Sequence, residues 1–198
     1  DDGAALYVAE LWGQRVTKIS SSDGRQLWTR VLAPPQGGSQ MSHEEARVTA
    51  QAESAAPFPF TCVSDEAHGR VYVSLWAQAR VLVLDAKTGE ELNRWSVGPH
   101  PCEMMLAPDG RLFVAEANQN TVGIIDTRSG RLLERLSSAL YPNAPPGSMP
   151  NTLALSPDGK VLFVGNANNN NVAVFEVETR GRSKSLGYIP VGWFPTSV

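Results

Sequence analysis

LFVAE at Leu112–Glu116 decides the fold, because three close copies of this stretch occur elsewhere in the chain. In each copy an aromatic residue is followed by Val and then by a small residue, a pattern typical of a β-strand. A second Val follows the aromatic residue by nine positions in all four copies, which indicates an internal repeat. The other copies are LYVAE at Leu6–Glu10, VYVSL at Val71–Leu75 and LFVGN at Leu162–Asn166.

Turn signals divide each repeat into short strands. Pro-Asp-Gly at 108–110 and 157–159 presets φ with Pro and allows a positive φ with Gly. Asp85–Gly89 and Asp126–Gly130 suit a longer hairpin loop that ends in a left-handed Gly. The expected strand at 80–84 is apolar on both faces, so its sheet is covered on both sides. These features predict an all-β β-propeller of four-stranded antiparallel blades, with four blades in this chain.

The repeat period is 41 residues where nothing interrupts it, between Tyr72 and Phe113. Longer spacings on both sides indicate insertions at about 33–59 and 137–148, which are rich in Pro, Gly, Ser and Ala. We interpret them as loops between blades, so 1–198 is predicted to be a single propeller region. The repeats are expected at about 3–32, 60–97, 98–136 and 149–190.

Composition excludes several classes of function. With 17 Lys and Arg against 20 Asp and Glu, the chain has no basic stripe that could neutralise the phosphates of a nucleic acid. No apolar run approaches the roughly 18 residues that a membrane-spanning helix needs. Cys62 and Cys102 are too few for a disulfide framework and are expected to be small, buried, apolar side chains.

The fourth repeat resembles the bacterial YVTN-type β-propeller repeat. The similarity lies in Ser156–Val164 (SPDGKVLFV) and in the Asn run 168–171 before Val172, and the third repeat matches nearly as well. The first two repeats depart from the family by placing Trp12 and Trp76 where the others carry Asn. The resemblance covers most of the chain outside the two insertions.

A narrower resemblance concerns 141–151 and 187–196, which are similar to propellers fused to a phosphoesterase domain of the alkaline-phosphatase type. It implies a protein exported from the cytoplasm, periplasmic, secreted or at the cell surface, with its catalytic domain outside these residues. A two-metal phosphatase site needs clustered Asp and His ligands. His43, His68 and His100 fall in different places of the repeat pattern, so we expect no catalytic residue, no metal site and no cofactor in this chain.

The two ends of the chain leave two arrangements open. The first repeat lacks its innermost strand, while 191–198 resembles an innermost strand such as Pro101–Leu106 or Pro150–Leu155. Either this last strand closes the first blade into a four-bladed ring, or the chain is part of a larger ring. We favour the second, because the resembled family usually has seven blades. An incomplete ring would expose strand edges and favour self-association.

Candidate site residues lie on the propeller face that carries the connections between blades, where loops vary while the blades hold them. Two Trp side chains there could bind a sugar ring or an apolar patch, or could pack under the first insertion. The Asn residues suit tight turns as well as a polar ligand. A metal at His100 and Glu103 is disfavoured because neighbours on a strand face opposite ways. The predicted ligand-binding residues are Glu10, Trp12, Trp76, His100, Glu103, Glu116, Asn118, Asn166 and Asn168.

These observations predict a non-catalytic, exported scaffold that binds a protein, a glycan or a catalytic domain of the same polypeptide through this face. One alternative is the accessory propeller of a larger phosphoesterase. A weaker alternative is a propeller enzyme with its site around His100 and Glu103. Because fold alone does not determine activity, the residues of the site must decide among these.

Overall fold

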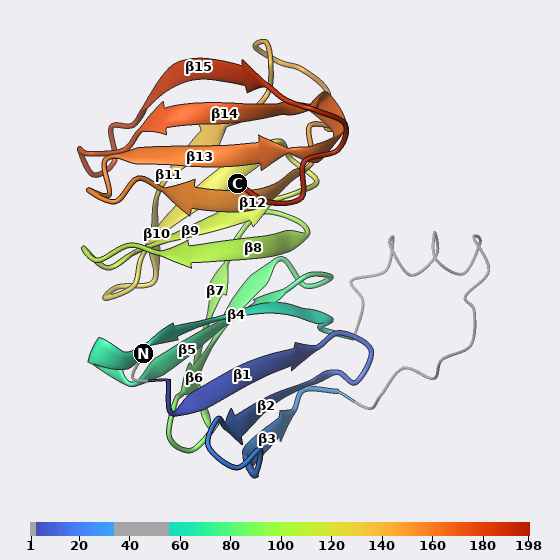
Figure 1. Cartoon of the computed structure of the whole chain (residues 1–198), viewed down its shortest axis with the longest axis vertical. Helices are drawn as coiled ribbons and strands as arrows, with labels where there is room; N and C mark the ends of the chain where they lie inside the picture. Colours follow the sequence, from blue (N-terminus) through green and yellow to red (C-terminus); the bar gives the residue numbers. More distant parts are fainter. Residues whose placement is uncertain (1–2, 34–55) are drawn as a thin grey trace, which may run out of the picture. The chain divides into compact units, whose positions relative to one another are not determined.

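The computed structural model describes residues 3–33 and 56–198, which are almost entirely β-structure (Figure 1). They contain fifteen strands and two short 3-10 helices, Glu66–His68 (η1) and Ala167–Asn169 (η2). The strands form four antiparallel sheets, each made of strands that are consecutive in the chain. The predicted all-β class and its bladed sheets are therefore confirmed. Most of the predicted insertion at 33–59, including His43, lies outside the described residues.

The chain divides into two compact units, and unit 1 comprises Asp1–Ser96. Its first sheet, blade 1, has three strands in the order β1-β2-β3, and its second, blade 2, has four in the order β4-β5-β6-β7. Blade 1 begins directly with the strand that is second in the other blades, as the sequence predicted. The bounds are β1 Ala5–Glu10, β2 Arg15–Ser20, β3 Gln26–Val31, β4 Pro59–Asp65, β5 Arg70–Leu75, β6 Arg80–Asp85 and β7 Glu91–Ser96.

Unit 2 comprises Val97–Val198 and contains two four-stranded sheets. Blade 3 has the order β8-β9-β10-β11 and blade 4 the order β12-β13-β14-β15. The bounds are β8 Pro101–Leu106, β9 Arg111–Glu116, β10 Thr121–Asp126, β11 Arg131–Ser137, β12 Pro150–Leu155, β13 Val161–Asn166, β14 Asn171–Glu176 and β15 Lys184–Pro190.

The four repeats found in the sequence occupy equivalent places in the four sheets. Each aromatic residue of the repeat is the third residue of its six-residue strand, and each second Val is the second residue of the following strand. The cross-strand partners of the aromatic residues follow the same register: Tyr7 pairs with Lys18, Tyr72 with Val83, Phe113 with Ile124 and Phe163 with Val174.

A left-handed residue followed by Pro begins three of the four sheets' first strands. Phe58, His100 and Met149 have φ between 48° and 55°, and Pro59, Pro101 and Pro150 follow them. Each left-handed residue accepts a backbone hydrogen bond at 3.0–3.1 Å from the residue just after the second strand of its blade. Because Pro has no N–H, it is suited to the first position of an edge strand.

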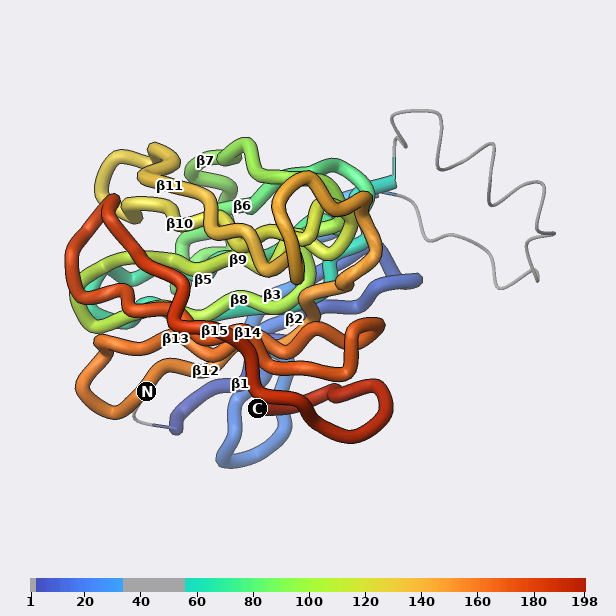
Figure 2. The backbone as a smooth tube through the Cα atoms, turned by 90° about the horizontal axis from the view of Figure 1, so that it is seen from above, coloured from blue at the N-terminus to red at the C-terminus, as the bar shows by residue number. Residues whose placement is uncertain are grey.

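The same pattern occurs once more near the carboxyl end. Phe194 has a φ of 51° and precedes Pro195. Residues 191–198 nevertheless have no strand geometry in this structure, although their sequence resembles an inner strand. Figure 2 traces them, in red, as a loop that ends at the label C. The turn that starts an inner strand is thus formed, while the strand itself is not.

Each unit has its own hydrophobic core between its two sheets. In unit 1 the core includes Val16 of blade 1 and Val73 and Leu82 of blade 2, all fully buried. In unit 2 it includes Phe113 and Ile124 of blade 3, with Leu162 and Val164 of blade 4. A blade is apolar on both faces because a neighbouring blade covers it, which is the basis of the stacked arrangement.

Neither Cys62 nor Cys102 forms a disulfide. Cys102 is buried, and its thiol lies 3.3 Å from the carbonyl oxygen of Pro150 and 3.5 Å from that of Ala115. Burial raises the pKa of the Cys102 thiol to about 11 and that of the partly buried Cys62 to about 12. Both thiols are therefore protonated at neutral pH and serve as packing groups, as the sequence predicted.

Candidate functional site

The predicted site residues of unit 1 lie at the end of β1 and in the loops after β1 and β5. Glu10 is held inside blade 1, since its carboxylate pairs with Arg15 at 2.8 Å and accepts a hydrogen bond from Thr17 at 2.9 Å. The Arg15 hydrogen bond, followed by that of Thr17, lowers the pKa of Glu10. The carboxylate is therefore ionised and engaged within its own blade.

The two indoles of unit 1 differ in exposure. Trp12 is 59% exposed and meets the ring of Phe58 edge-on, with centroids 5.6 Å apart. Trp76 is only partly exposed, and its backbone N–H donates to the Phe58 carbonyl at 3.0 Å. Trp12 thus packs against the start of blade 2 and also presents an exposed face. A packing role and a ligand-binding role for this side chain are therefore compatible.

In unit 2 the predicted residue Glu116 is fully buried and satisfied by its own blade and the connection before it. Its carboxylate lies 2.9 Å from the Arg135 guanidinium and accepts hydrogen bonds from Thr121 and the Gly98 N–H, both at 2.6 Å. A Cβ at Gly98 or Gly123 would come within 2.5 or 2.7 Å of this carboxylate. Two glycines therefore make room for one buried charge, and the group holds the fold together.

Asn166 is also fully buried rather than displayed to a ligand. Its side-chain amide donates to the Ser138 carbonyl at 3.0 Å and to Asn171 at 2.9 Å. Both of these partners are acceptors, which fixes the orientation of the amide, and its Oδ1 has no hydrogen-bond partner. Asn166 ties the connection after blade 3 to blade 4.

The remaining predicted residues surround the start of blade 3 and the loops of unit 2. His100 is partly buried, which lowers the pKa of its imidazole, and its carbonyl accepts from the Ala117 N–H at 3.1 Å. Glu103 is partly buried in β8, while Asn118 and Asn168 are exposed. Within the part of the chain that the structure describes, no three His, Cys, Asp or Glu residues lie together as a metal site would require.

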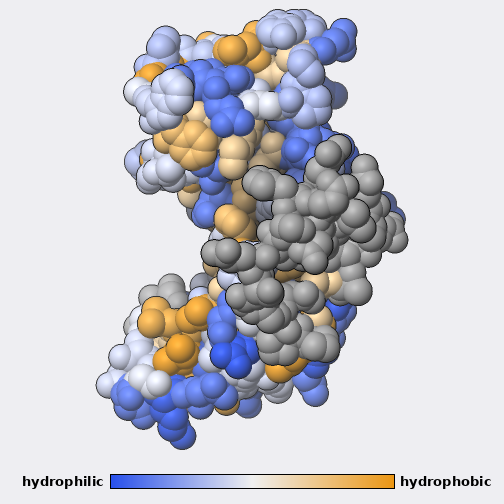
Figure 3. Space-filling model, turned by 90° about the vertical axis from the view of Figure 1, so that its right-hand side faces the viewer, coloured by the Kyte–Doolittle hydropathy of each residue, from blue (hydrophilic) through white to orange (hydrophobic). Residues whose placement is uncertain are grey.

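The connections at the loop-bearing end of unit 2 contain no Asp, Glu, Lys or Arg. They comprise 97–100, 117–120, 138–149, 167–170 and 191–198. Several of their large apolar side chains are exposed, foremost Trp193 at 90% and Tyr141 at 60%. Figure 3 faces this end of the strands and shows apolar surface among hydrophilic surface. We call these five connections the neutral surface.

Side-chain amides hold the neutral surface in place. Asn120 accepts hydrogen bonds from the N–H groups of Gly147 and Ser148 at 2.8 and 2.6 Å and donates to the Pro145 carbonyl at 2.8 Å. Asn170 accepts from the Phe194 N–H at 2.9 Å, as Gln14 of unit 1 accepts from the Phe58 N–H at 2.9 Å. The amide just before β2, β10 or β14 thus positions the next turn that starts a blade.

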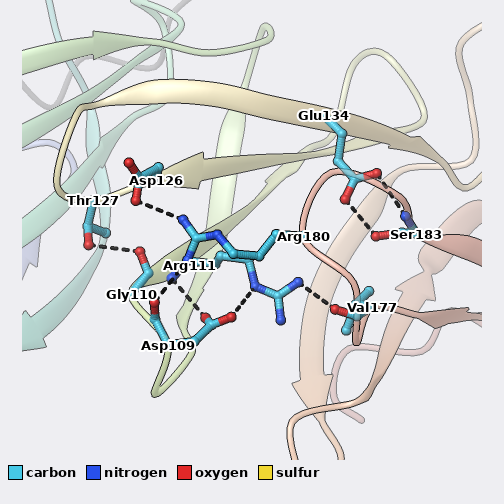
Figure 4. Close-up of polar contacts among 9 residues, drawn as sticks. All are labelled: Asp109, Gly110, Arg111, Asp126, Thr127, Glu134, Val177, Arg180 and Ser183. Carbon is cyan, nitrogen blue, oxygen red and sulfur yellow. Dashed lines mark hydrogen bonds and ion pairs between the residues drawn. The ribbon is translucent and has the colours of Figure 1, made fainter.

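The opposite end of unit 2 carries the turns 107–110, 127–130, 156–160 and 177–183, and we call it the turn-bearing end. Unlike the neutral surface, it is rich in charged groups, and these join its two blades (Figure 4). Arg111 is buried, pairs with Asp109 at 2.7 Å and donates to the Val177 carbonyl at 2.5 Å. Arg180 of blade 4 reaches Asp126 of blade 3 at 2.8 Å. Glu134 of blade 3 accepts two hydrogen bonds from Ser183 of blade 4. This end is occupied by contacts that fix one blade to the next.

The aromatic residues of the neutral surface were missed by sequence reasoning. Trp193 and Phe194 lie in a segment expected to be a strand, and Tyr141 lies in an insertion that was singled out only for its family resemblance. One signal was available in the sequence: once the strands are placed, the absence of charge from every connection at one end is visible. The exposure of these side chains follows only from the structure.

Comparison with known proteins supports the fold. The family model described as "Outer membrane protein assembly factor BamB" matches residues 13–182. No curated protein matches the chain. No helix among the described residues has the length and apolar character to cross a membrane.

Solved structures similar to the chain have diverse activities. A putative 6-phosphogluconolactonase from Bacteroides uniformis has 17% identity and a TM-score of 0.72 over 99% of this chain and 57% of its own. An inactive virginiamycin B lyase from Staphylococcus aureus has 14% identity and a TM-score of 0.65, over 95% of this chain and 53% of its own. Kuenenia stuttgartiensis hydrazine synthase has 21% identity and a TM-score of 0.64, over 81% of this chain and 42% of its own. The chain therefore spans about half of each structure, and such identities show the fold alone.

Proposed function

We propose that this chain, which belongs to the family of the outer membrane protein assembly factor BamB, is a non-catalytic binding scaffold that engages its partner through its loop-bearing end. The contrast between the two ends of unit 2 carries the proposal. Charged groups at the turn-bearing end are used between blades, whereas the neutral surface displays apolar side chains to solvent. Exposed apolar patches of this kind mark interaction sites.

Unit 1 supports the same interpretation at its own loop-bearing end. Trp12 keeps a free face there, and Glu10 stays engaged inside its blade. The buried Glu116 and Asn166 support binding indirectly, since Glu116 holds Gly98 in the connection before blade 3 and Asn166 holds Ser138 in the connection after it. The proposal includes a location outside the cytoplasm, supported by the outer-membrane role that the family's description states. Fractionation of cells that make the full-length protein tests this location.

Site-specific photocrosslinking in those cells tests the binding end. Benzoylphenylalanine at Asn118 or Asn168 reports on the neutral surface, and the same residue at Arg128 or Lys160 reports on the turn-bearing end of the same blades. We expect crosslinked adducts from the first pair only. Equal adducts from both pairs, or none from the neutral surface, would contradict the proposal.

A second candidate is the accessory region of a larger phosphoesterase. It is favoured by the resemblance at 141–151 and 187–196 and by the fact that the chain spans about half of the solved structures it matches. Hydrolysis of p-nitrophenyl phosphate by the full-length protein, but not by residues 1–198, would support this candidate. Absence of hydrolysis by the full-length protein would remove it.

A further inference from the structure

Each blade interrupts its β-ladder with a bulge in the outer strand, always at the same place. One residue is added to the outer strand opposite the step between the fourth and fifth residues of the strand before it. In blade 2, Leu92 is the extra residue, because its neighbours Glu91 and Asn93 pair with adjacent residues of β6. The extra residue is a Leu in all four blades: Leu27, Leu92, Leu133 and Leu186.

These bulges occur at sheet edges. The outer strands β3, β7, β11 and β15 are edge strands of their sheets. The first strands of blades 2, 3 and 4, at the other edge, are also bulged, at 59–62, 101–104 and 150–152. The two strands that correspond to the middle of a blade pair in continuous register in all four blades. A bulge adds twist wherever it lies in a sheet, so its restriction to the edges indicates a role at the edges.

The outer strands would otherwise invite pairing with another strand. Most residues of β7 and β11 are exposed to solvent. A strand paired on one side only presents backbone N–H and C=O groups as a template for a further strand. Charge repulsion does not protect β11 against a second copy of itself, because it carries Glu134 between Arg131 and Arg135. Opposite charges placed across two strands favour pairing.

The extra residue disrupts this template. A bulged residue is left out of the ladder, bends its strand and increases the local twist. A regular partner strand therefore cannot bond to the backbone on both sides of the bulge. The protection matters at β11, because the extra Leu133 is 36% exposed and follows Leu132, which is 41% exposed. A straight edge there would offer apolar side chains together with backbone groups, which is the combination that promotes strand association.

We infer that the bulged Leu of each outer strand is a device that prevents the edge of the blade from pairing with a second copy of the chain. The extra backbone residue provides the protection, and its side chain is secondary. This inference concerns the outer strands and is independent of the proposed function at the loop-bearing end.

Deletion of Leu133 in the full-length protein tests the device. Leu132 and Glu134 then become neighbours, as their partners on β10 already are, so the register on both sides of the bulge is kept. We expect the straightened β11 to pair with β11 of a second copy about a two-fold axis, which doubles the mass measured by sedimentation at high concentration. Amide hydrogen exchange within 131–137 should slow as this dimer forms.

Leu133→Ala is the matched control, because it keeps the extra residue and shortens only the side chain. It should keep the mass of the parent protein. Deletion of Leu92 in β7 is a second, independent variant that should also dimerise, and thermal melting shows whether each variant folds.

Several results would overturn the inference. One is a folded deletion variant that keeps the mass of the parent protein, and another is a dimer in which exchange slows elsewhere but not in the straightened strand. Loss of folding in both deletion variants would assign the bulge to the shape of the blade instead. An equal gain in mass in Leu133→Ala would make the side chain responsible rather than the bulge.

Discussion

The two ends of unit 2 connect the same eight strands, yet their chemistry differs throughout. At the turn-bearing end the short turns carry Asp, Arg and Lys, and Arg111 and Arg180 span the two blades. At the loop-bearing end the connections carry no charge, and amides such as Asn120 hold them. Charge is thus used where blades are joined, and neutral groups remain where a partner can approach.

Unit 1 joins its blades with the same geometry but different residues. The carbonyl of Ala86, just after the third strand of blade 2, receives three donors from blade 1: Lys18 at 2.8 Å, Trp28 at 3.2 Å and the Tyr7 hydroxyl at 3.4 Å. In unit 2 the equivalent carbonyl of Val177 receives one donor, from Arg111. The Trp28 ring also lies where a Cβ at Gly89 would come within 2.8 Å. The position of the acceptor is shared because it belongs to the backbone, whereas each unit supplies its own donors.

The largest expected effect comes from the buried charge beneath the loop-bearing end. Glu116→Ala should lower the free energy of unfolding by about 3–5 kcal/mol, because it removes two charge-assisted hydrogen bonds and leaves the Gly98 N–H and the Thr121 hydroxyl without their acceptor, while the partly exposed Arg135 can be hydrated. Chemical denaturation measures this change. The exposed pair Glu178 and Lys160 supplies the control, and Glu178→Ala should change stability by no more than about 0.5 kcal/mol. Equal losses in both variants would show that burial of Glu116 is unimportant.

At the turn-bearing end the expected loss is somewhat smaller. Arg111→Ala removes the pair with Asp109, the bond to Val177 and the stacking of the guanidinium 5.3 Å from the Phe113 ring centroid. We expect a loss of about 2–4 kcal/mol, since Asp109 is partly exposed and can be hydrated once unpaired. Arg128→Ala, at an exposed position of the same end, should be nearly neutral. A neutral Arg111→Ala would mean that charge does not join these blades.

Asn120→Ala should have an intermediate and local effect. It removes three hydrogen bonds to 145–148, so we expect a loss of about 1–3 kcal/mol and faster amide hydrogen exchange at Gly147 and Ser148. Exposed Asn118→Ala is the control and should change neither quantity. If exchange at these amides stays slow in Asn120→Ala, another contact must hold the insertion.

The smallest effect concerns Asp126. The Ser129 hydroxyl and then Arg180 lower the pKa of Asp126, so this carboxylate contributes stability above the pKa of the unfolded chain. That contribution is lost as the pH falls through the lower, folded pKa. Asp126→Asn should therefore cost up to about 1 kcal/mol at pH 7 and less in strong acid. A cost that does not change with pH, measured by denaturation across the acid range, would exclude this linkage.

Much of the fold could be predicted because its signals are local. The repeat placed Tyr7, Tyr72, Phe113 and Phe163 in equivalent strands, and the missing strand of blade 1 was visible in the spacing. The candidate site was harder to predict. Glu116 and Asn166 were selected for their place near a loop, and they are buried because the neighbouring connection folds over them.

The sequence by itself determined the strands, their turns and their repetition, because alternation, Pro and Gly act within a few residues. Only the tertiary structure decided which polar groups are used internally and which aromatic side chains stay exposed. Burial depends on contacts between segments far apart in the chain, such as Asn170 with Phe194 or Arg111 with Val177. No local pattern encodes these contacts, since the residue type alone does not tell whether an Asn holds a loop in place or faces solvent.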